Sequence, residues 1–209
     1  MGALKRRGWA IVVFAVVACT ALVSSLVPAS AFDPNGNVYH FNYSVDASAH
    51  MKTLNQTITI KNGTFVGGID FGSGDLRGKI TLPKSTFTFS VGGLVPLLTA
   101  TAKIIPTKLV TGTVDLNTLT VTATSVFNVQ LVSAYVYGTT APNLVGTQCI
   151  TASPASVTMS GVAVLGGAST FSGTFTMPPF KNCGLETRAI NLVLAGPGDT
   201  FTATATPAA

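Results

Sequence analysis

Polar and apolar residues alternate along most of the chain that follows residue 31. The run Thr86–Val91, which reads Thr-Phe-Thr-Phe-Ser-Val, shows this period of two most clearly. Successive side chains of a β-strand point to opposite faces, so the period predicts strands with one polar and one apolar face. Threonine, valine and phenylalanine fill these runs and suit a pleated sheet better than a helix. The same alternation recurs at Thr118–Thr122, Thr174–Met177 and Asp199–Thr204.

Glycine and proline pairs divide these strands at intervals of about ten residues. Gly92-Gly93, Gly166-Gly167 and Pro178-Pro179 are three such pairs. Many short strands with turns between them are typical of antiparallel sheets that stack or close. We therefore predict a mainly β fold, either an antiparallel β-sandwich or a curved, partly closed β-barrel.

One stretch near the C-terminus departs from this period. Between Leu185 and Ala195 the apolar residues fall at helical spacing, and Gly196-Pro197 follows as a helix stop. The stretch predicts one short helix that packs its apolar stripe on the sheet and is tethered at its start by Cys183. That stripe consists of Leu185, Ala189, Ile190, Val193 and Leu194.

Two segments share the pattern apolar-x-Gly-x-apolar-Thr-apolar-Pro. They are Leu76–Pro83 and Phe171–Pro178, and Val110–Leu116 repeats all of the pattern except the proline. A glycine inside a strand indicates a bulge, a bend or a close backbone approach, and a following proline ends the pairing. We interpret the pattern as a weak repeat of two halves, with chance similarity among threonine-rich strands as the alternative.

Residues 1–31 have the parts of a secretory signal peptide. Lys5-Arg6-Arg7 supply positive charge, the run from Trp9 to Leu22 is apolar, and Ala29-Ser30-Ala31 fits a small-residue cleavage site. We predict a signal peptide at 1–31 and a single secreted β domain at 32–209. The protein is then secreted or held in the extracytoplasmic cell envelope.

Cys19 allows a second interpretation of the leader. Val16–Cys19 fits the pattern at which bacterial lipoproteins are cleaved and lipidated, so a lipid anchor at Cys19 is the alternative localisation. The residues that follow Cys19 stay apolar, whereas a lipoprotein usually continues with a polar tether. This favours the ordinary signal peptide.

Charge excludes one class of partner. Three of the twelve Lys and Arg residues lie in the leader, which leaves nine basic residues against seven acidic ones in the predicted mature chain. No basic run follows residue 31, so we predict no nucleic-acid partner. No later apolar stretch is long enough for a membrane-spanning helix.

The cysteines predict a disulfide. Cys19 leaves with the leader, and Cys149 and Cys183 remain as a pair in an oxidising compartment. Closing a loop of that length stabilises a fold by roughly 3–4 kcal/mol in the chain-entropy model. Because a paired thiol is no nucleophile, a cysteine enzyme is disfavoured.

Residues suited to catalysis are scarce. His40 and His50 lack the spacing of a metal site, so no metal or cofactor is predicted. The loop from Asp70 to Asp75 is better explained as a polar hairpin turn than as a calcium loop. We predict that the protein is not an enzyme; a hydrolase would require a histidine to meet an acid and a hydroxyl in space.

Two stretches, Gly93–Leu98 and Val126–Tyr137, are more apolar than a strand with one buried face requires. They are either central strands covered on both faces or the lining of a concave surface for an apolar ligand such as an acyl chain. The candidate lining residues are Leu94, Leu97, Val129 and Leu131.

Several short motifs near the C-terminus form one arrangement: Cys149, Pro154, Val157–Gly161, Phe171–Pro178, Phe180–Leu185, Ile190-Asn191 and Gly196–Asp199. In this arrangement the chain resembles a group of exported actinobacterial proteins of uncharacterised function. The similarity covers most of residues 63–206. It implies export, a strand-rich fold and a disulfide, and it implies no activity or catalytic residue.

Together these features predict a secreted or cell-envelope-associated, non-enzymatic β protein. Its expected role is to bind a partner, such as a lipid or another envelope component, or an apolar ligand. An outer-envelope barrel or pore is the first alternative, although no aromatic girdles mark the strand ends. A hydrolase is the second.

Overall fold

The structure is a computed structural model that describes residues 37–91 and 95–208. The predicted leader at 1–31, with Cys19, lies outside these residues, as does Leu94. In chain order the strands are β1 (Val38–Met51), β2 (Gln56–Asp70), β3 (Asp75–Thr81), β4 (Ser85–Val91), β5 (Val95–Pro106), β6 (Val110–Asp115), β7 (Thr120–Val136), β8 (Cys149–Thr151), β9 (Ala155–Val162), β10 (Ser169–Met177), β11 (Phe180–Lys181) and β12 (Gly196–Pro207). A 3₁₀-helix at Gly184–Glu186 and helix α1 at Thr187–Leu194 lie between β11 and β12. The predicted mainly β fold is confirmed.

Eight antiparallel strands close into a barrel. The ring runs β1–β2–β3–β6–β7–β9–β10–β12 and returns to β1. Of the two predicted architectures, the barrel is the one that forms. A closed sheet leaves its strands without free edges, because every strand has a hydrogen-bonded neighbour on both sides.

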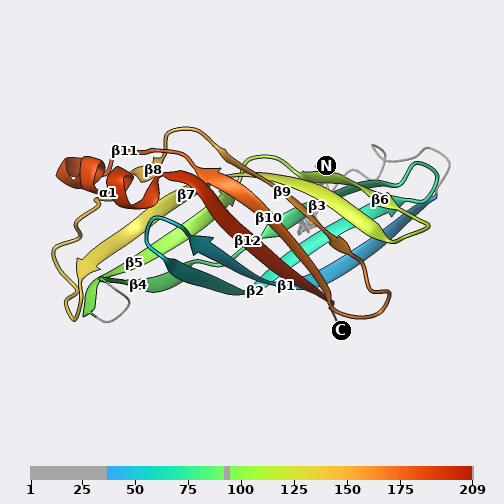
Figure 1. Ribbon diagram of the computed structural model, residues 1–209, viewed down its shortest axis with the longest axis horizontal. Coiled ribbons are helices and arrows are strands. Elements are labelled where there is room, and N and C mark those ends of the chain that lie inside the picture. Colours follow the sequence, from blue (N-terminus) through green and yellow to red (C-terminus); the bar gives the residue numbers. More distant parts are fainter. Residues whose placement is uncertain (1–36, 92–94, 209) are drawn as a thin grey trace, which may run out of the picture.

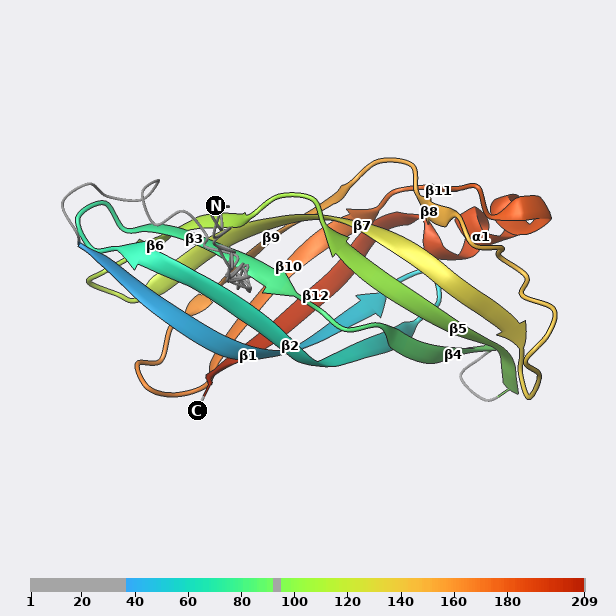
Figure 2. The same ribbon diagram turned by 180° about the vertical axis from the view of Figure 1, so that it is seen from behind.

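Four further strands lengthen the barrel beyond one end of this ring (Figures 1 and 2). The first half of β7 pairs with β6 and β9, and its second half pairs with β5 and β8. β4 continues the line of β3, and Ser85 Oγ donates to the Thr59 carbonyl of β2 at 2.7 Å. The wall therefore has eight strand positions, and four of them are broken, at residues 82–84, 107–109, 152–154 and 178–179.

The period of two in the sequence corresponds to the inside and outside of the barrel. From Thr120 to Leu131 of β7 the burial alternates strictly, with mostly apolar residues inside and threonines such as Thr122 exposed outside. Full burial of a Val, Leu or Phe side chain stabilises the fold by about 1.5–3 kcal/mol. The inward residues of β7 are Val121, Ala123, Ser125, Phe127, Val129 and Leu131.

The glycines of the repeated pattern lie where two strands approach closely. A Cβ on Gly112 would lie 2.1 Å from the Thr122 carbonyl oxygen, and one on Gly173 would lie 2.1 Å from that of Thr158. The predicted close backbone approach is confirmed at both positions. Leu76–Pro83 and Phe171–Pro178 occupy the third and seventh strand positions, which face each other across the barrel.

The predicted C-terminal helix is present, but its packing differs from the prediction. Of the predicted stripe, Ile190 packs on the core and Leu194 is buried, whereas Leu185, Ala189 and Val193 are exposed. Leu185 lies in the 3₁₀-helix, whose three residues per turn place it out of phase with α1. The Asn191 side chain bonds both the amide and the carbonyl of Phe180, which fixes the face that α1 turns toward β11.

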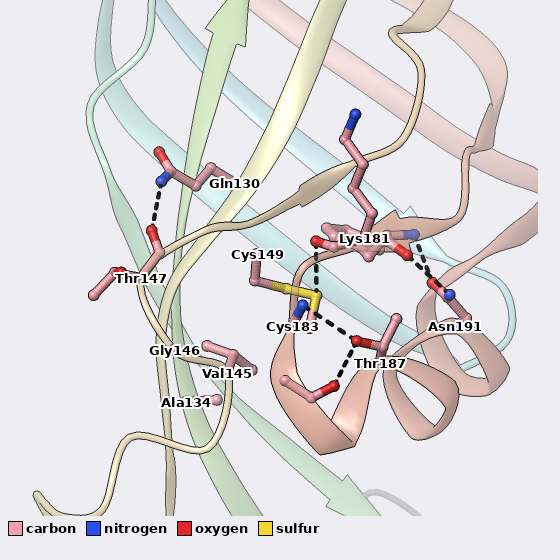
Figure 3. The surroundings of a disulfide bond; sticks show 12 residues. Gln130, Ala134, Val145, Gly146, Thr147, Cys149, Lys181, Cys183, Thr187 and Asn191 are labelled. Atoms are coloured by element: carbon pink, nitrogen blue, oxygen red, sulfur yellow. Dashed lines mark hydrogen bonds between the residues drawn. A yellow bond between two sulfur atoms is a disulfide. The ribbon is translucent and has the colours of Figure 1, made fainter.

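The predicted disulfide joins β8 to the segment before α1 (Figure 3). Cys149 and Cys183 have Cα atoms 4.2 Å apart, and both residues are fully buried. The Cys183 amide donates to Thr187 Oγ1 at 3.2 Å, and that hydroxyl donates to the Gly184 carbonyl at 2.8 Å. A buried disulfide is compatible with an extracytoplasmic location.

Candidate functional site

One cavity between the inward side chains of the barrel is too small for an acyl chain. This partly enclosed cavity measures about 20 Å³, while sites for small organic ligands measure about 300–1,000 Å³. A single water molecule is the largest guest of such a space. Its lining is Ile80, Leu82, Ile104, Pro106, Ser125, Phe127, Val157, Met159 and Phe201.

The structure does not bring the candidate apolar lining residues together. Leu97 is 46 % exposed near the start of β5, whereas Val129 and Leu131 are buried in the core. Val129 pairs with Ile104, near the other end of β5. Of the two interpretations of these apolar strands, Val129 and Leu131 fit the one in which they fill the core.

The histidines do not meet an acid within the described residues. His40 is exposed, and His50 Nδ1 lies 3.3 Å from the Thr57 hydroxyl. No carboxylate lies within hydrogen-bond or ion-pair distance of His50 there. Residues 37–91 and 95–208 also contain no group of three His, Cys, Asp or Glu residues that could hold a metal ion.

The loop between β2 and β3 is the predicted polar hairpin turn. Asp70 Oδ1 accepts hydrogen bonds from the amides of Gly72 at 2.7 Å and Ser73 at 3.3 Å. Gly74 has a φ of +77° and its amide donates to the Asp70 carbonyl. These bonds satisfy the turn internally, as an Asx turn does.

Five exposed lysines gather on one side of the barrel, and we call them the lysine cluster: Lys61, Lys79, Lys84, Lys103 and Lys108. They come from β2, β3, β5 and the breaks at 82–84 and 107–109. Figure 2 looks onto β3, β5 and β6 on this side. Within the described part of the chain, none of the five has an ion-pair or hydrogen-bond partner.

Sheet register brings these lysines together. Ser85 pairs with Ala102, so one step further along the two strands Lys84 lies beside Lys103. The Ser85–Thr59 bond places Lys84 near Lys61 in the same way. Neighbouring strands are about 5 Å apart, so Lys61, Lys84 and Lys103 form a row over three adjacent strand positions.

Two exposed apolar side chains lie within the cluster. Val66 pairs with Lys79, and Leu109 faces Lys79 one step beyond the Gly78–Val110 pair. Val66 is 46 % exposed and Leu109 is 45 % exposed. The surface therefore combines cations with solvent-exposed apolar side chains.

Sequence reasoning missed this cluster because it searched for a contiguous basic run. The five lysines are scattered from residue 61 to residue 108. Their common property is an outward position on neighbouring strands or strand breaks, and that property follows only from the strand order. In contrast to the segment that carries the cluster, the stretch between Asp115 and Lys181 contains no charged residue and no histidine.

A shallow groove of about 660 Å³ lies on the other side of the barrel, where the breaks at 152–154 and 178–179 adjoin. We call it the strand-break groove. Lys52 extends along its rim, since a Cβ on Gly198 would lie 3.4 Å from Lys52 Nζ. The groove is lined by Ser153, Pro154, Ala155, Ser156, Thr174, Phe175, Thr176, Pro178 and Gly198.

Asp199 is buried beside this groove and is 2 % exposed. Its Oδ1 accepts from the Lys52 amide at 2.9 Å, while its Oδ2 is shielded and has no partner among the described residues. Burial raises the pKa of Asp199, and hydrogen bonds from the amides of Lys52 and Met177 and the nearby His50 oppose this effect. The carboxylate ties the β1–β2 turn to the start of β12.

No family model matches this chain, and neither does any curated protein or solved structure. The resemblance to exported actinobacterial proteins therefore stays a prediction. Among the described residues, no helix combines the length and apolar character of a membrane span.

Proposed function

We propose that the protein is a non-enzymatic protein of the extracytoplasmic cell envelope that binds the surface of an anionic membrane. The lysine cluster carries this proposal, because five unpaired cations assembled from separate strands surround two exposed apolar side chains. Cations attract anionic headgroups, and apolar side chains among them suit the boundary between headgroups and acyl chains. A soluble polyanion would leave Val66 and Leu109 exposed.

The expected affinity is that of a reversible peripheral protein. Each lysine near an anionic surface contributes about 1 kcal/mol at physiological salt, so the five contribute about 5 kcal/mol. Partial burial of Val66 and Leu109 adds about 2 kcal/mol. The total corresponds to a dissociation constant of about 10 μM.

The alternatives receive less support. An apolar ligand inside the barrel meets a cavity of about 20 Å³. A membrane-spanning pore requires an apolar outer band, whereas the outward residues of β9, β10 and β12 are mostly threonine and serine. A hydrolase requires an acid that is hydrogen-bonded to a histidine; Asp199 and His50 interact electrostatically, but the hydrogen-bond partner of His50 is the Thr57 hydroxyl.

Vesicle sedimentation tests the proposal with the mature chain. We expect binding to vesicles that contain phosphatidylglycerol, release by added salt, and no binding to pure phosphatidylcholine. The double variant Lys84→Gln/Lys103→Gln should bind about thirtyfold more weakly, because two of the five contacts are lost. Lys181→Gln/Arg188→Gln removes the same charge near α1 and should bind as the wild type does.

Three results would overturn the proposal. The first is equal binding to neutral and anionic vesicles. The second is an equal loss in the Lys181→Gln/Arg188→Gln control. The third is capture by immobilised polyphosphate without any binding to vesicles, which would identify a soluble phosphate polymer as the ligand.

A further inference from the structure

We infer that the strand-break groove is a second binding site and that it takes a neutral glycan chain. The groove differs from the lysine cluster in every property that selects a ligand. It is concave, and none of the residues that line it is charged. It lies at the sixth and seventh strand positions, across the barrel from the cluster at the second to fourth (Figures 1 and 2).

The groove exists because two neighbouring strand positions break at the same height. β8 gives way to β9 at residues 152–154, and β10 gives way to β11 at Pro178-Pro179. The Ala152 amide donates to the Pro179 carbonyl at 2.7 Å, so one hydrogen bond crosses the gap. Its volume of about 660 Å³ falls within the range of about 300–1,000 Å³ for small-ligand sites.

Hydroxyl groups dominate the polar surface of this groove. Ser153, Ser156, Thr174 and Thr176 each supply a group that both donates and accepts hydrogen bonds. The hydroxyls continue beyond the groove, because Thr174 pairs with Thr158 on β9 and with Thr200 on β12. A chain of sugar hydroxyls presents the same mixture of donors and acceptors.

Apolar surface completes the match. Pro154 and Pro178 contribute their rings to the lining and offer contacts for the C–H faces of sugar rings, whereas the Phe175 side chain is buried and packs on Phe127 in the core. An anionic polymer would find one cation there, Lys52 at the rim. An extended peptide would find only two-residue unpaired edges in this groove, at Ala155-Ser156 and Thr176-Met177, because the pairing of β9 with β10 ends at Val157 and Phe175.

A pull-down on insoluble neutral polysaccharides tests this inference. The probes are cellulose, chitin and mannan, followed by calorimetry with an oligosaccharide of whichever polymer retains the protein. The variant Thr174→Val/Thr176→Val removes two hydroxyls while keeping the branched shape that suits a strand. It should bind at least tenfold more weakly, because each lost hydrogen bond leaves a ligand hydroxyl unpaired.

The controls separate this site from general stickiness and from the lysine cluster. Thr111→Val/Thr113→Val removes two exposed hydroxyls from β6, away from the groove, and should bind glycan as the wild type does. Lys52→Gln and Lys84→Gln/Lys103→Gln should also bind normally. Retention on none of the three polymers overturns the inference. So does normal binding by Thr174→Val/Thr176→Val, and so does loss of binding in Lys52→Gln, which would indicate an anionic ligand.

Discussion

Asp199 holds a carboxylate oxygen that has no hydrogen-bond partner and no solvent contact in the described structure. Burial raises the pKa of Asp199 in the folded state. In the unfolded chain the group titrates near its ordinary value of about 3.9. The folded state therefore takes up the proton first as the pH falls, and the contribution of Asp199 to stability increases from neutral pH toward pH 4.

Asp199→Asn should remove this dependence. The amide oxygen still accepts from the Lys52 backbone, and no charge is buried at neutral pH. We expect Asp199→Asn to gain more stability relative to the wild type at pH 7 than at pH 4. Urea denaturation at both pH values measures the difference, and a difference that is independent of pH would contradict the assignment.

Asp115 provides a control of opposite sign. Hydrogen bonds from the amides of Asn117 and Thr118 lower the pKa of this exposed carboxylate. Its contribution to stability is present above the unfolded pKa and is lost as the pH falls through the folded pKa. Asp115→Asn should therefore lose most relative to the wild type at neutral pH and least in acid.

Gly173 tests the close approach of β10 and β9. An added Cβ would lie 2.1 Å from the Thr158 carbonyl oxygen, which belongs to the backbone and cannot rotate away. We expect Gly173→Ala to destabilise the fold by about 1–3 kcal/mol through overpacking. Gly167→Ala is the control, since its Cβ would meet only the Val164 side chain. Equal midpoints of chemical denaturation for the two variants would contradict this account.

At the scale of elements, α1 takes the place of a strand beside β11. The Asn191 side chain donates to the Phe180 carbonyl at 3.0 Å and accepts from the Phe180 amide. Asn191→Ala leaves both backbone groups unpaired and should cost about 1–3 kcal/mol in the free energy of unfolding. Leu192→Ala, on the exposed face of the same helix, should change it by less than about 0.5 kcal/mol. If thermal denaturation ranks the two variants the other way, α1 is not held by Asn191.

The Cys149–Cys183 disulfide secures the same end of the barrel. Removing it with Cys149→Ala/Cys183→Ala should lower the free energy of unfolding by roughly 3–4 kcal/mol in the chain-entropy model. Hydrogen exchange should accelerate first in β8, β11 and α1, while β1, β2 and β12 of the closed ring stay protected. Uniform acceleration over the whole chain would show that the bond stabilises the barrel as one unit.

Local sequence patterns predict the elements well and their packing only in part. The run Thr86–Val91 becomes β4, and the helical spacing after Leu185 becomes α1, because both periods are set by backbone geometry. The orientation of α1 could not be predicted, since it depends on a side-chain bond between Asn191 and Phe180, eleven residues apart in sequence. The same limit applies to the choice between sandwich and barrel, which rests on the long-range pairing of β7 with β9.

At the scale of the whole molecule, strand order places chemistry that the sequence leaves scattered. Lys84 and Lys103 become neighbours through the pairing of β4 with β5. Ser156 and Thr174 come to line the same groove through the pairing of β9 with β10. Composition alone shows a nearly balanced chain after residue 31, with nine basic residues against seven acidic ones, and it does not show that five lysines share one side of the barrel. The strand-break groove, in contrast, is lined mostly by residues of the uncharged stretch from 116 to 180.

The positions of the two sites lead to a last prediction, which rests on both proposals. The lysine cluster is centred on the third strand position and the strand-break groove on the seventh, so the barrel lies between them. A membrane and a glycan chain can then be held at the same time without competing. We expect vesicles containing phosphatidylglycerol to sediment with the polysaccharide only when the protein is present. Lys84→Gln/Lys103→Gln should free the vesicles while keeping the protein on the glycan, and Thr174→Val/Thr176→Val should do the reverse. Competition between vesicle and glycan for one protein molecule would place both ligands on the same face.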